Sequence, residues 1–143
     1  MKLPDGCGDT SGRVVKLNKS VYGLKQAGRR WAMRLGDVLV SKVGMEQCKA
    51  DPCVFRLIRD DVVVMIVCVH VDDIIVAGVP DACDFLSKCL LEEFQTTGGE
   101  LSWYLGCAFE RDRNKDVLRV SQRAFVESVV SRYGVDAESN LPA

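Results

Sequence analysis

The 143-residue chain is long enough for one domain with a buried core and too short for a large multidomain enzyme. Its 48% hydrophobic and 27% charged residues are typical of a soluble globular protein and exclude a disordered segment. The longest uncharged apolar run, residues 62–69, is too short to cross a membrane, and the first residues show no apolar signal region. Seven cysteines, an odd number, are typical of reduced thiols inside a cell. We therefore expect an intracellular protein that is not membrane-embedded.

Charge divides the chain into two halves of opposite sign. Residues 1–60 carry 12 Lys and Arg against 6 Asp and Glu, a net of +6, whereas residues 61–143 carry 7 against 14, a net of −7, which sums to −1. This distribution fits a protein that binds phosphates on one side and metal on the other. Two ordinary solvated faces would carry the same charges, so charge alone does not decide the function.

The first half of the chain is predicted to contain one helix and two strands. The helix, residues 28–43, is predicted from Trp31, Leu35 and Val38, which recur at helical spacing before a glycine at position 44. The expected elements in order are a loop at 1–12, a strand at 13–17, a turn at 20–26, this helix, a strand at 53–58 and a turn at 59–61.

The second half is predicted to contain three strands and two helices after that turn, in a single α+β unit. The first helix starts at Pro80, a favoured first position, and its apolar face is expected to bury Phe85. The last helix is expected to be capped by Ser121 and to turn Phe125, Val129 and Tyr133 inward. The expected elements are a hairpin at 62–78, a helix from 80 that ends before the glycines at 98–99, a strand at 101–110, a turn at 111–116, a strand at 117–120 and a helix at 122–133.

Residues 62–78 are the most distinctive stretch. A run rich in Val and Ile leads to Asp72 and Asp73 and continues through a second such run, which predicts a hairpin with both carboxylates at its tip. Two carboxylates on a rigid support suit Mg²⁺, which prefers hard oxygen ligands, although most Asp-Asp tips are only turns. Strand alternation predicts that His70 shares a face with Asp72, either as part of a catalytic face or as an ordinary strand histidine.

A basic segment with interleaved aromatic residues precedes and enters the first predicted helix. Charges that neutralise phosphates, beside aromatic rings that stack on bases, are typical of a nucleic-acid or nucleotide groove. Trp31 is also the obvious packing anchor of the helix, so this segment alone is not decisive. Its members are Lys16, Lys19, Tyr22, Lys25, Arg29, Arg30, Trp31 and Arg34.

Several ordered motifs resemble those of copia-type LTR-retrotransposon reverse transcriptases. Residues 16–31, KLNKSVYGLKQAGRRW, are similar to the family signature KLxKSLYGLKQAxRxW. The segments DPCVF at 51–55, HVDDI at 70–74 and GELSWYLG at 99–106 resemble the family's DxCxF, YVDDI and LGxLxxFLG motifs. The SQ at 121–122 followed by Phe125 resembles SQxxY, and the final LPA is similar to a TPM-like ending. These motifs cover essentially residues 1–143.

The resemblance implies a polymerase palm, an antiparallel sheet with helices packed on one face, followed by the start of a thumb, as one partial reverse transcriptase domain at 1–143. It implies that the parent enzyme carries out RNA-directed DNA synthesis by two-metal nucleotidyl transfer with Mg²⁺ (or Mn²⁺). The implied partners are an RNA or DNA primer–template and dNTPs. Asp72 and Asp73 would be the catalytic and metal-binding carboxylates.

The resemblance also implies which residues contact the substrates. Gln26 would lie near the incoming nucleotide and template, Lys25 and Arg29 would contact phosphates, and residues 103–106 would form a hairpin that positions the primer end. An ordinary aromatic core strand at 103–106 is compatible with that role. The expected substrate- and nucleic-acid-binding residues are Lys25, Gln26, Arg29, His70, Trp103, Tyr104 and Gly106.

The sequence also departs from the family pattern. His70 replaces the usual Tyr, Gly28 stands where Pro is frequent, and residues 96–98 differ from an MKDLG-like lead. The family's first catalytic Asp lies upstream of the segment that matches residues 3–6, so the chain is expected to lack the fingers and one metal ligand and to be inactive by itself. The alternatives are a non-catalytic nucleic-acid- or partner-binding remnant of a decayed or co-opted element, and a pseudogene product that does not fold. The parent element is expected in cytoplasmic virus-like particles or the nucleus; oligomeric state is not predicted.

Overall fold

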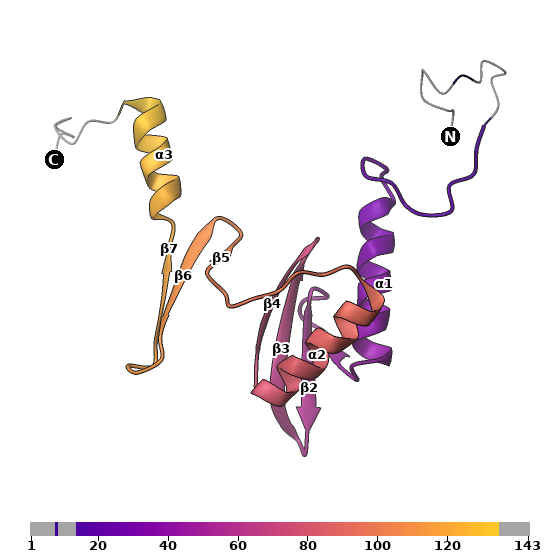
Figure 1. The fold of residues 1–143 in the computed structure, drawn as a ribbon, viewed down its shortest axis with the longest axis horizontal. Helices are drawn as coiled ribbons and strands as arrows, with labels where there is room; N and C mark the ends of the chain where they lie inside the picture. The colour runs from indigo at the N-terminus through magenta and orange to yellow at the C-terminus, as the bar shows by residue number, and fades with distance from the viewer. Residues whose placement is uncertain (1–7, 9–13, 135–143) are drawn as a thin grey trace.

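The computed structural model describes residue 8 and residues 14–134, which form three helices and two antiparallel sheets (Figure 1). The helices are α1 (Ala27–Ser41), α2 (Pro80–Glu93) and α3 (Arg123–Tyr133). The strands are β1 (Glu46–Gln47), β2 (Val54–Arg59), β3 (Val62–His70), β4 (Asp73–Gly78), β5 (Trp103–Tyr104), β6 (Cys107–Asp112) and β7 (Val117–Ser121). The predicted α+β class is confirmed, and the predicted helices differ from the observed ones by at most two residues at the ends that were specified.

The first sheet has the order β1-β2-β3-β4, with every neighbouring pair antiparallel. Phe55 pairs with Val67 and Leu57 pairs with Met65, and because alternate residues share a face, these four side chains point to the same side of the sheet. All four are buried. The core therefore lies on one face of β2 and β3.

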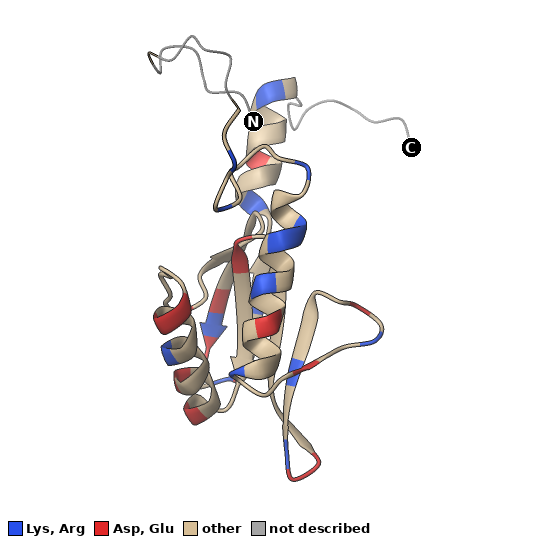
Figure 2. Cartoon of the chain, turned by 90° about the vertical axis from the view of Figure 1, so that its right-hand side faces the viewer, with Lys and Arg blue, Asp and Glu red and all other residues tan. Residues whose placement is uncertain are grey.

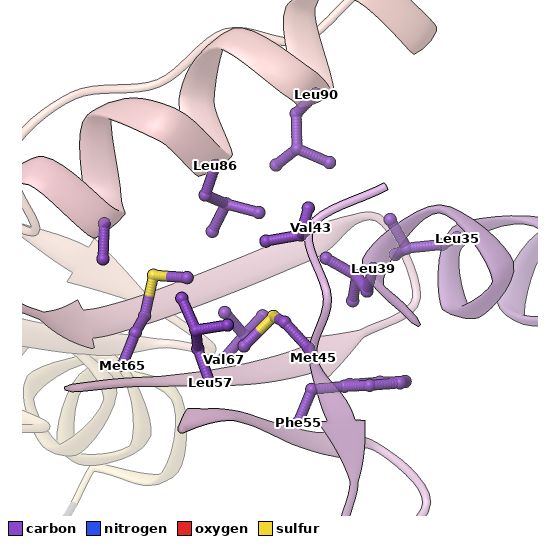
Figure 3. Close-up of a cluster of buried hydrophobic side chains, with 11 residues drawn as sticks. Leu35, Leu39, Val43, Met45, Phe55, Leu57, Met65, Val67, Leu86 and Leu90 are labelled. Carbon is purple, nitrogen blue, oxygen red and sulfur yellow. The ribbon is translucent and has the colours of Figure 1, made fainter. Parts of the chain in front are cut away.

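Helices α1 and α2 cover that face of the first sheet (Figure 3). Leu35 and Leu39 of α1 and Leu86 and Leu90 of α2 are buried in one cluster with the strand residues. The prediction of helices packed on one face is correct for α1 and α2. The prediction that Phe85 belongs to the buried face of α2 is wrong, because its side chain is 42% exposed. The buried stripe follows Ala82, Leu86 and Leu90, and Phe85 lies beside this stripe.

Ionic and aromatic contacts join the end of α2 to α1. The carboxylate of Glu93 accepts hydrogen bonds from both Arg34 and Lys42. The hydrogen bond from Lys42 is the main cause that holds the pKa of Glu93 below its ordinary value. The ring of Trp31 meets that of Phe94 edge-on, with centroids 5.1 Å apart. These contacts attach the end of α2 to the start, the middle and the end of α1.

The second sheet has the order β5-β6-β7 and is followed directly by α3. Figure 1 shows this sheet and α3 beside the layer that α1, α2 and the first sheet form, with α3 extending from the end of β7. No side chain of α3 is buried, and Phe125 and Tyr133 are 61% and 71% exposed. The prediction that Phe125, Val129 and Tyr133 point into a core is therefore wrong, because α3 does not fold back onto either sheet.

Two predicted strands also differ from the structure. The predicted strand at 13–17 is absent from residues 14–17, where only Val14 makes an isolated bridge, and position 13 lies outside the described residues. The predicted strand at 101–110 is broken by Leu105 and Gly106, whose φ angles are 48° and 79°. Positive φ at both positions suits a two-residue hairpin turn, so the chain reverses there between β5 and β6. In the part of the chain that the structure describes, no helix is both long enough and apolar enough to span a membrane.

Gly78 closes β4 at a point where the backbone approaches its neighbour. A Cβ atom at this position would lie 2.8 Å from the Cβ of Met65 and 2.9 Å from the carbonyl oxygen of Val64. The same carbonyl accepts a hydrogen bond from the backbone N–H of Val79 at 3.0 Å, where the chain turns into α2. A side chain at position 78 would therefore meet a backbone carbonyl that is already hydrogen-bonded.

We expect Gly78→Ala to lower the free energy of unfolding by about 1–3 kcal/mol, because the added methyl group overpacks the contact with β3. Gly28→Ala is the matched control: nothing lies within 4 Å of its added Cβ, and alanine favours the helix by up to about 1 kcal/mol. Urea unfolding monitored by circular dichroism measures both variants. Equal midpoints for the two variants would contradict the close packing at Gly78.

Candidate active site

The two predicted carboxylates lie at the tip of the β3–β4 hairpin. β3 ends at His70, β4 begins at Asp73, and Val71 and Asp72 form the two-residue turn between them. Both aspartates are exposed. The predicted hairpin is confirmed, but the prediction that His70 shares a strand face with Asp72 is wrong, because the strand ends before Asp72. His70 pairs across the hairpin with Asp73 instead, so these two side chains share a face.

Val71 adopts an unusual backbone conformation at this tip. Its φ angle is 53°, in the left-handed region that β-branched residues rarely enter. A two-residue hairpin turn needs positive φ at its first central position, where asparagine, aspartate or glycine is usual. A valine held there costs on the order of 1–3 kcal/mol, which the surrounding structure must supply.

Two side chains from distant parts of the sequence hydrogen-bond to this turn. The hydroxyl of Tyr22 donates to Oδ2 of Asp72 at 2.6 Å across a sequence separation of 50 residues. The indole Nε1–H of Trp31 donates to the carbonyl of Val71 at 2.7 Å across 40 residues. Sequence reasoning had assigned these aromatic residues to base stacking or helix packing and missed both contacts. The sequence did carry a signal for these contacts. Tyr22 and Trp31 each have a polar hydrogen that can be donated, and both lie in the segment at 16–31 that resembles the family signature.

Two tyrosines near the tip have a pKa above the ordinary value. The pKa of Tyr22 lies above its ordinary value, first because its hydroxyl donates to the Asp72 carboxylate and then because a phenolate would lie beside a negative charge. The pKa of Tyr104 is also raised, first by burial and then by the neighbouring groups Cys68, Asp73 and Cys53. Tyr104 of β5 therefore lies within electrostatic range of the tip.

The residues expected to position a primer lie on the β5–β6 hairpin. Trp103 pairs with Ala108 and Tyr104 with Cys107, which makes the hairpin that the resemblance implied. Tyr104 is partly buried, whereas Trp103 is 56% exposed. Trp103 and Gly106 line a groove of about 490 Å³ together with residues from the start of α3, among them Phe125. Tyr104 thus lies near the carboxylate tip, whereas Trp103 and Gly106 line the groove beside α3.

Lys25, Gln26 and Arg29 lie at the start of α1 and are exposed. Gln26 directly precedes the helix, and its carbonyl accepts a hydrogen bond from the N–H of Arg30 at 3.1 Å. Because Tyr22 and Trp31 both contact the tip, these three residues occupy the stretch between two contacts with the candidate site. The basic residues of α1 lie between its start and its middle, and its last turn has none (Figure 2). Lys25, Gln26 and Arg29 therefore belong to a segment whose two ends, Tyr22 and Trp31, contact the hairpin tip.

The side chains at the tip supply two candidate metal ligands. Adjacent carboxylates offer the hard oxygen atoms that Mg²⁺ prefers, so Asp72 and Asp73 fit this ion chemically. Among residues 14–134 and residue 8, no group of three or more His, Cys, Asp or Glu side chains is arranged to hold a metal ion. The described residues therefore supply a pair of acidic ligands and no third one.

The two tyrosines report on the two aspartates separately. We expect Asp72→Asn to lower the pKa of Tyr22 toward its ordinary value and to leave that of Tyr104 unchanged, whereas Asp73→Asn lowers only that of Tyr104. NMR titration of ring-labelled tyrosines measures both values, and each variant is the control for the other. A Tyr22 pKa that does not respond to Asp72→Asn would contradict the hydrogen bond.

The hydrogen bond from Tyr22 to Asp72 also makes the stability of the folded chain depend on pH. A group whose pKa is raised on folding stabilises the protein below its unfolded value, so the contribution of Tyr22 is present below about pH 10 and is lost as pH rises through the raised pKa.

Comparison with known proteins identifies the relatives of this chain. The family model described as reverse transcriptase (RNA-dependent DNA polymerase) matches residues 1–141. The chain is 31% identical over 142 residues to the retrovirus-related Pol polyprotein from transposon TNT 1-94 of Nicotiana tabacum, a match that covers 94% of this chain and 10% of that protein. It is 32% identical over 126 residues to the corresponding polyprotein from transposon RE1 of Arabidopsis thaliana, covering 87% of this chain and 8% of the relative.

A shorter match joins the chain to a yeast element. Over 63 residues it is 35% identical to the truncated transposon Ty1-A Gag-Pol polyprotein of Saccharomyces cerevisiae, covering 44% of this chain and 5% of that protein. No solved structure matches the chain significantly. The chain thus spans a tenth or less of the length of these relatives. The resemblance to copia-type retrotransposon enzymes is confirmed, and the chain belongs to the reverse transcriptase (RNA-dependent DNA polymerase) family.

Proposed function

We propose that this chain is the part of a retrotransposon reverse transcriptase that presents the metal-binding carboxylates Asp72 and Asp73 to the primer–template. The observation that carries the proposal is the geometry of the hairpin tip. Its turn receives hydrogen bonds from Tyr22 and Trp31, which both lie in the stretch at 16–31 that resembles the family signature. This geometry supports a site in which carboxylates that would bind metal lie near cations that would bind phosphate.

The acidic pair suits the metal-dependent chemistry of the family. Bound Mg²⁺ or Mn²⁺ would activate the primer 3′-hydroxyl and stabilise the leaving pyrophosphate. Asp72 in the turn and Asp73 at the start of β4 would hold this metal from a hairpin that is anchored on the core. The hydrogen bond from Tyr22 occupies Oδ2 of Asp72 and would fix the rotation of the carboxylate, so that its other oxygen faces a metal. One further carboxylate from outside the described residues would complete a two-metal site.

The proposed nucleic-acid contacts surround the tip. Lys25 and Arg29 would neutralise phosphates of the template or the incoming dNTP, and Gln26 would contact the nucleotide from the start of α1. The partly buried Tyr104 would lie against the primer end near the tip, and exposed Trp103 with Gly106 would support it from the hairpin turn. His70, on the same face as Asp73, would contact the primer or the nucleotide.

The two sheets would then have different roles. We assign the four-stranded sheet with α1 and α2 to a polymerase palm, because an antiparallel sheet covered on one face leaves its other face for nucleic acid. The β5–β7 sheet would position the primer, and α3 would be the start of a thumb. Residues 1–143 would form one partial reverse transcriptase domain.

Asp72→Asn tests this assignment in a polymerase that contains this chain within its complete reverse transcriptase region. We expect Mg²⁺-dependent primer extension to fall roughly 100-fold or more, because asparagine lacks the charge that stabilises the metal. Asp61→Asn is the matched control. Asp61 belongs to a second Asp-Asp turn at the other end of β3, and its φ of 61° is one that asparagine tolerates.

Undiminished extension by the Asp72→Asn enzyme would contradict the site assignment. The rival function, a nucleic-acid-binding remnant without catalysis, predicts a different result. An enzyme with both aspartates intact would then bind primer–template in a salt-dependent manner and extend it in neither Mg²⁺ nor Mn²⁺.

A further inference from the structure

We propose that Trp31 is a positioning residue for the carboxylate tip: its indole N–H holds the Val71 carbonyl and selects the turn conformation that presents Asp72. This inference rests on the proposed function, because it concerns how the metal-binding carboxylates are aimed. It assigns to Trp31 a role beyond packing of α1. The indole N–H donates to the carbonyl of the peptide group that joins Val71 to Asp72.

That peptide group controls the type of turn. In a two-residue hairpin turn, the carbonyl of the first central residue belongs to the peptide between the two central residues. Rotating this peptide by about 180° interconverts turns with positive φ at the first central residue alone and turns with positive φ at both. Val71 has positive φ and Asp72 does not, so the hairpin adopts the first type. The bond to Trp31, at 2.7 Å, holds this carbonyl in that orientation.

The sequence of the turn does not select this conformation by itself. Glycine is the usual residue at the first central position of such a turn, and Val71 is β-branched. The turn at the other end of β3 differs: Asp60 and Asp61, with φ of 50° and 61°, are residues that tolerate the left-handed region. Of the hydrogen bonds made by described residues, none reaches that turn from a distant side chain. Of the two turns that flank β3, the one whose own residues are less suited to a turn is thus the one that a distant side chain hydrogen-bonds.

Trp31 is held firmly enough to impose this geometry. Its ring packs against the core and meets Phe94 edge-on, with centroids 5.1 Å apart and planes at 68°. The guanidinium of Arg34 lies 6.0 Å from the centre of the Phe94 ring and also bonds to Glu93. The backbone N–H of Phe94 closes the end of α2 on Leu90 at 2.8 Å. Helices α1 and α2 therefore both fix the indole that holds the tip.

Hydrogen exchange in the wild-type chain gives the first test. The indole N–H of Trp31 should exchange slowly, because it is bonded to Val71, whereas that of Trp103, which is 56% exposed, should exchange quickly and serves as the internal reference. NMR resolves the two indole signals. Equal, fast exchange of both indoles would overturn the proposal without any variant.

Substitution at Trp31 gives the second test, read out by Mn²⁺ binding. We expect Trp31→Phe, which keeps a ring against Phe94 and loses the N–H, to weaken binding of Mn²⁺ at the tip about two- to tenfold, the range that one hydrogen bond supplies. Broadening of the Asp72 and Asp73 amide signals by Mn²⁺ measures this affinity. Tyr133→Phe is the matched control, because it removes one polar hydrogen from an exposed aromatic residue of α3.

A second substitution that restores Mn²⁺ binding distinguishes a positioning role of Trp31 from a packing role. Adding Val71→Gly to Trp31→Phe should restore Mn²⁺ affinity, because glycine takes positive φ without strain and favours this turn unaided. A folded Trp31→Phe variant with wild-type Mn²⁺ affinity would overturn the proposal, as would a loss that Val71→Gly does not relieve.

Failure of the proposed function is distinguishable from failure of this inference. If Mn²⁺ does not bind the tip of the wild-type chain, the metal assignment fails. The positioning role is then decided by exchange of the Trp31 indole N–H in the wild-type chain: it holds if this exchange is slower than that of Trp103, and it is overturned if both are equally fast. If Trp31→Phe does not fold, the indole exchange of the wild-type chain decides the inference.

Discussion

The register of β2 against β3 is the constraint on which the rest of the structure depends. Phe55 and Leu57 face Val67 and Met65 beneath the two helices, and a shift of one residue would move these side chains to the opposite face. Burial of this face fixes which residues of β3 point to the core, and β3 then pairs with β2 as far as Cys68 and with β4 as far as His70. Because β3 ends at His70, the same constraint places Asp72 in the turn and Asp73 at the first position of β4. The hydrophobic core thus determines the position of the two most polar residues of the hairpin.

The sequence predicted the elements whose patterns are local. α1, α2 and the central hairpin were recognisable because helical spacing, a first-turn proline and runs of β-branched residues each report on a few neighbouring positions. The contacts of Tyr22 and Trp31 with the tip were not predictable in this way, since they join residues 50 and 40 positions apart and depend on how α1 lies against the sheet. The carboxylate pair could be found from the sequence, and the side chains that hold it could not.

The errors have a common physical origin in the second half of the chain. The apolar pattern of α3 predicted an inward face, but Phe125 and Tyr133 are largely exposed, because a pattern shows that a face is suited to burial and not that a partner is present. The break at Leu105 was missed because leucine rarely adopts positive φ, and only Gly106 beside it favours a turn. In both places the local sequence was compatible with more than one conformation.

The position of β4 at the edge of the first sheet affects how the chain behaves in solution. One side of its backbone pairs with β3, and the other side offers a row of N–H and C=O groups with no strand beside it in the described part of the chain. Edge strands of natural proteins are usually protected by charges, prolines or bulges, because an open edge is a template for another strand. β4 carries one charge, at Asp73, and continues as Ile-Ile-Val-Ala-Gly. Strand addition at β4 is therefore the expected route by which the isolated chain would aggregate, and it would begin beside the carboxylates themselves.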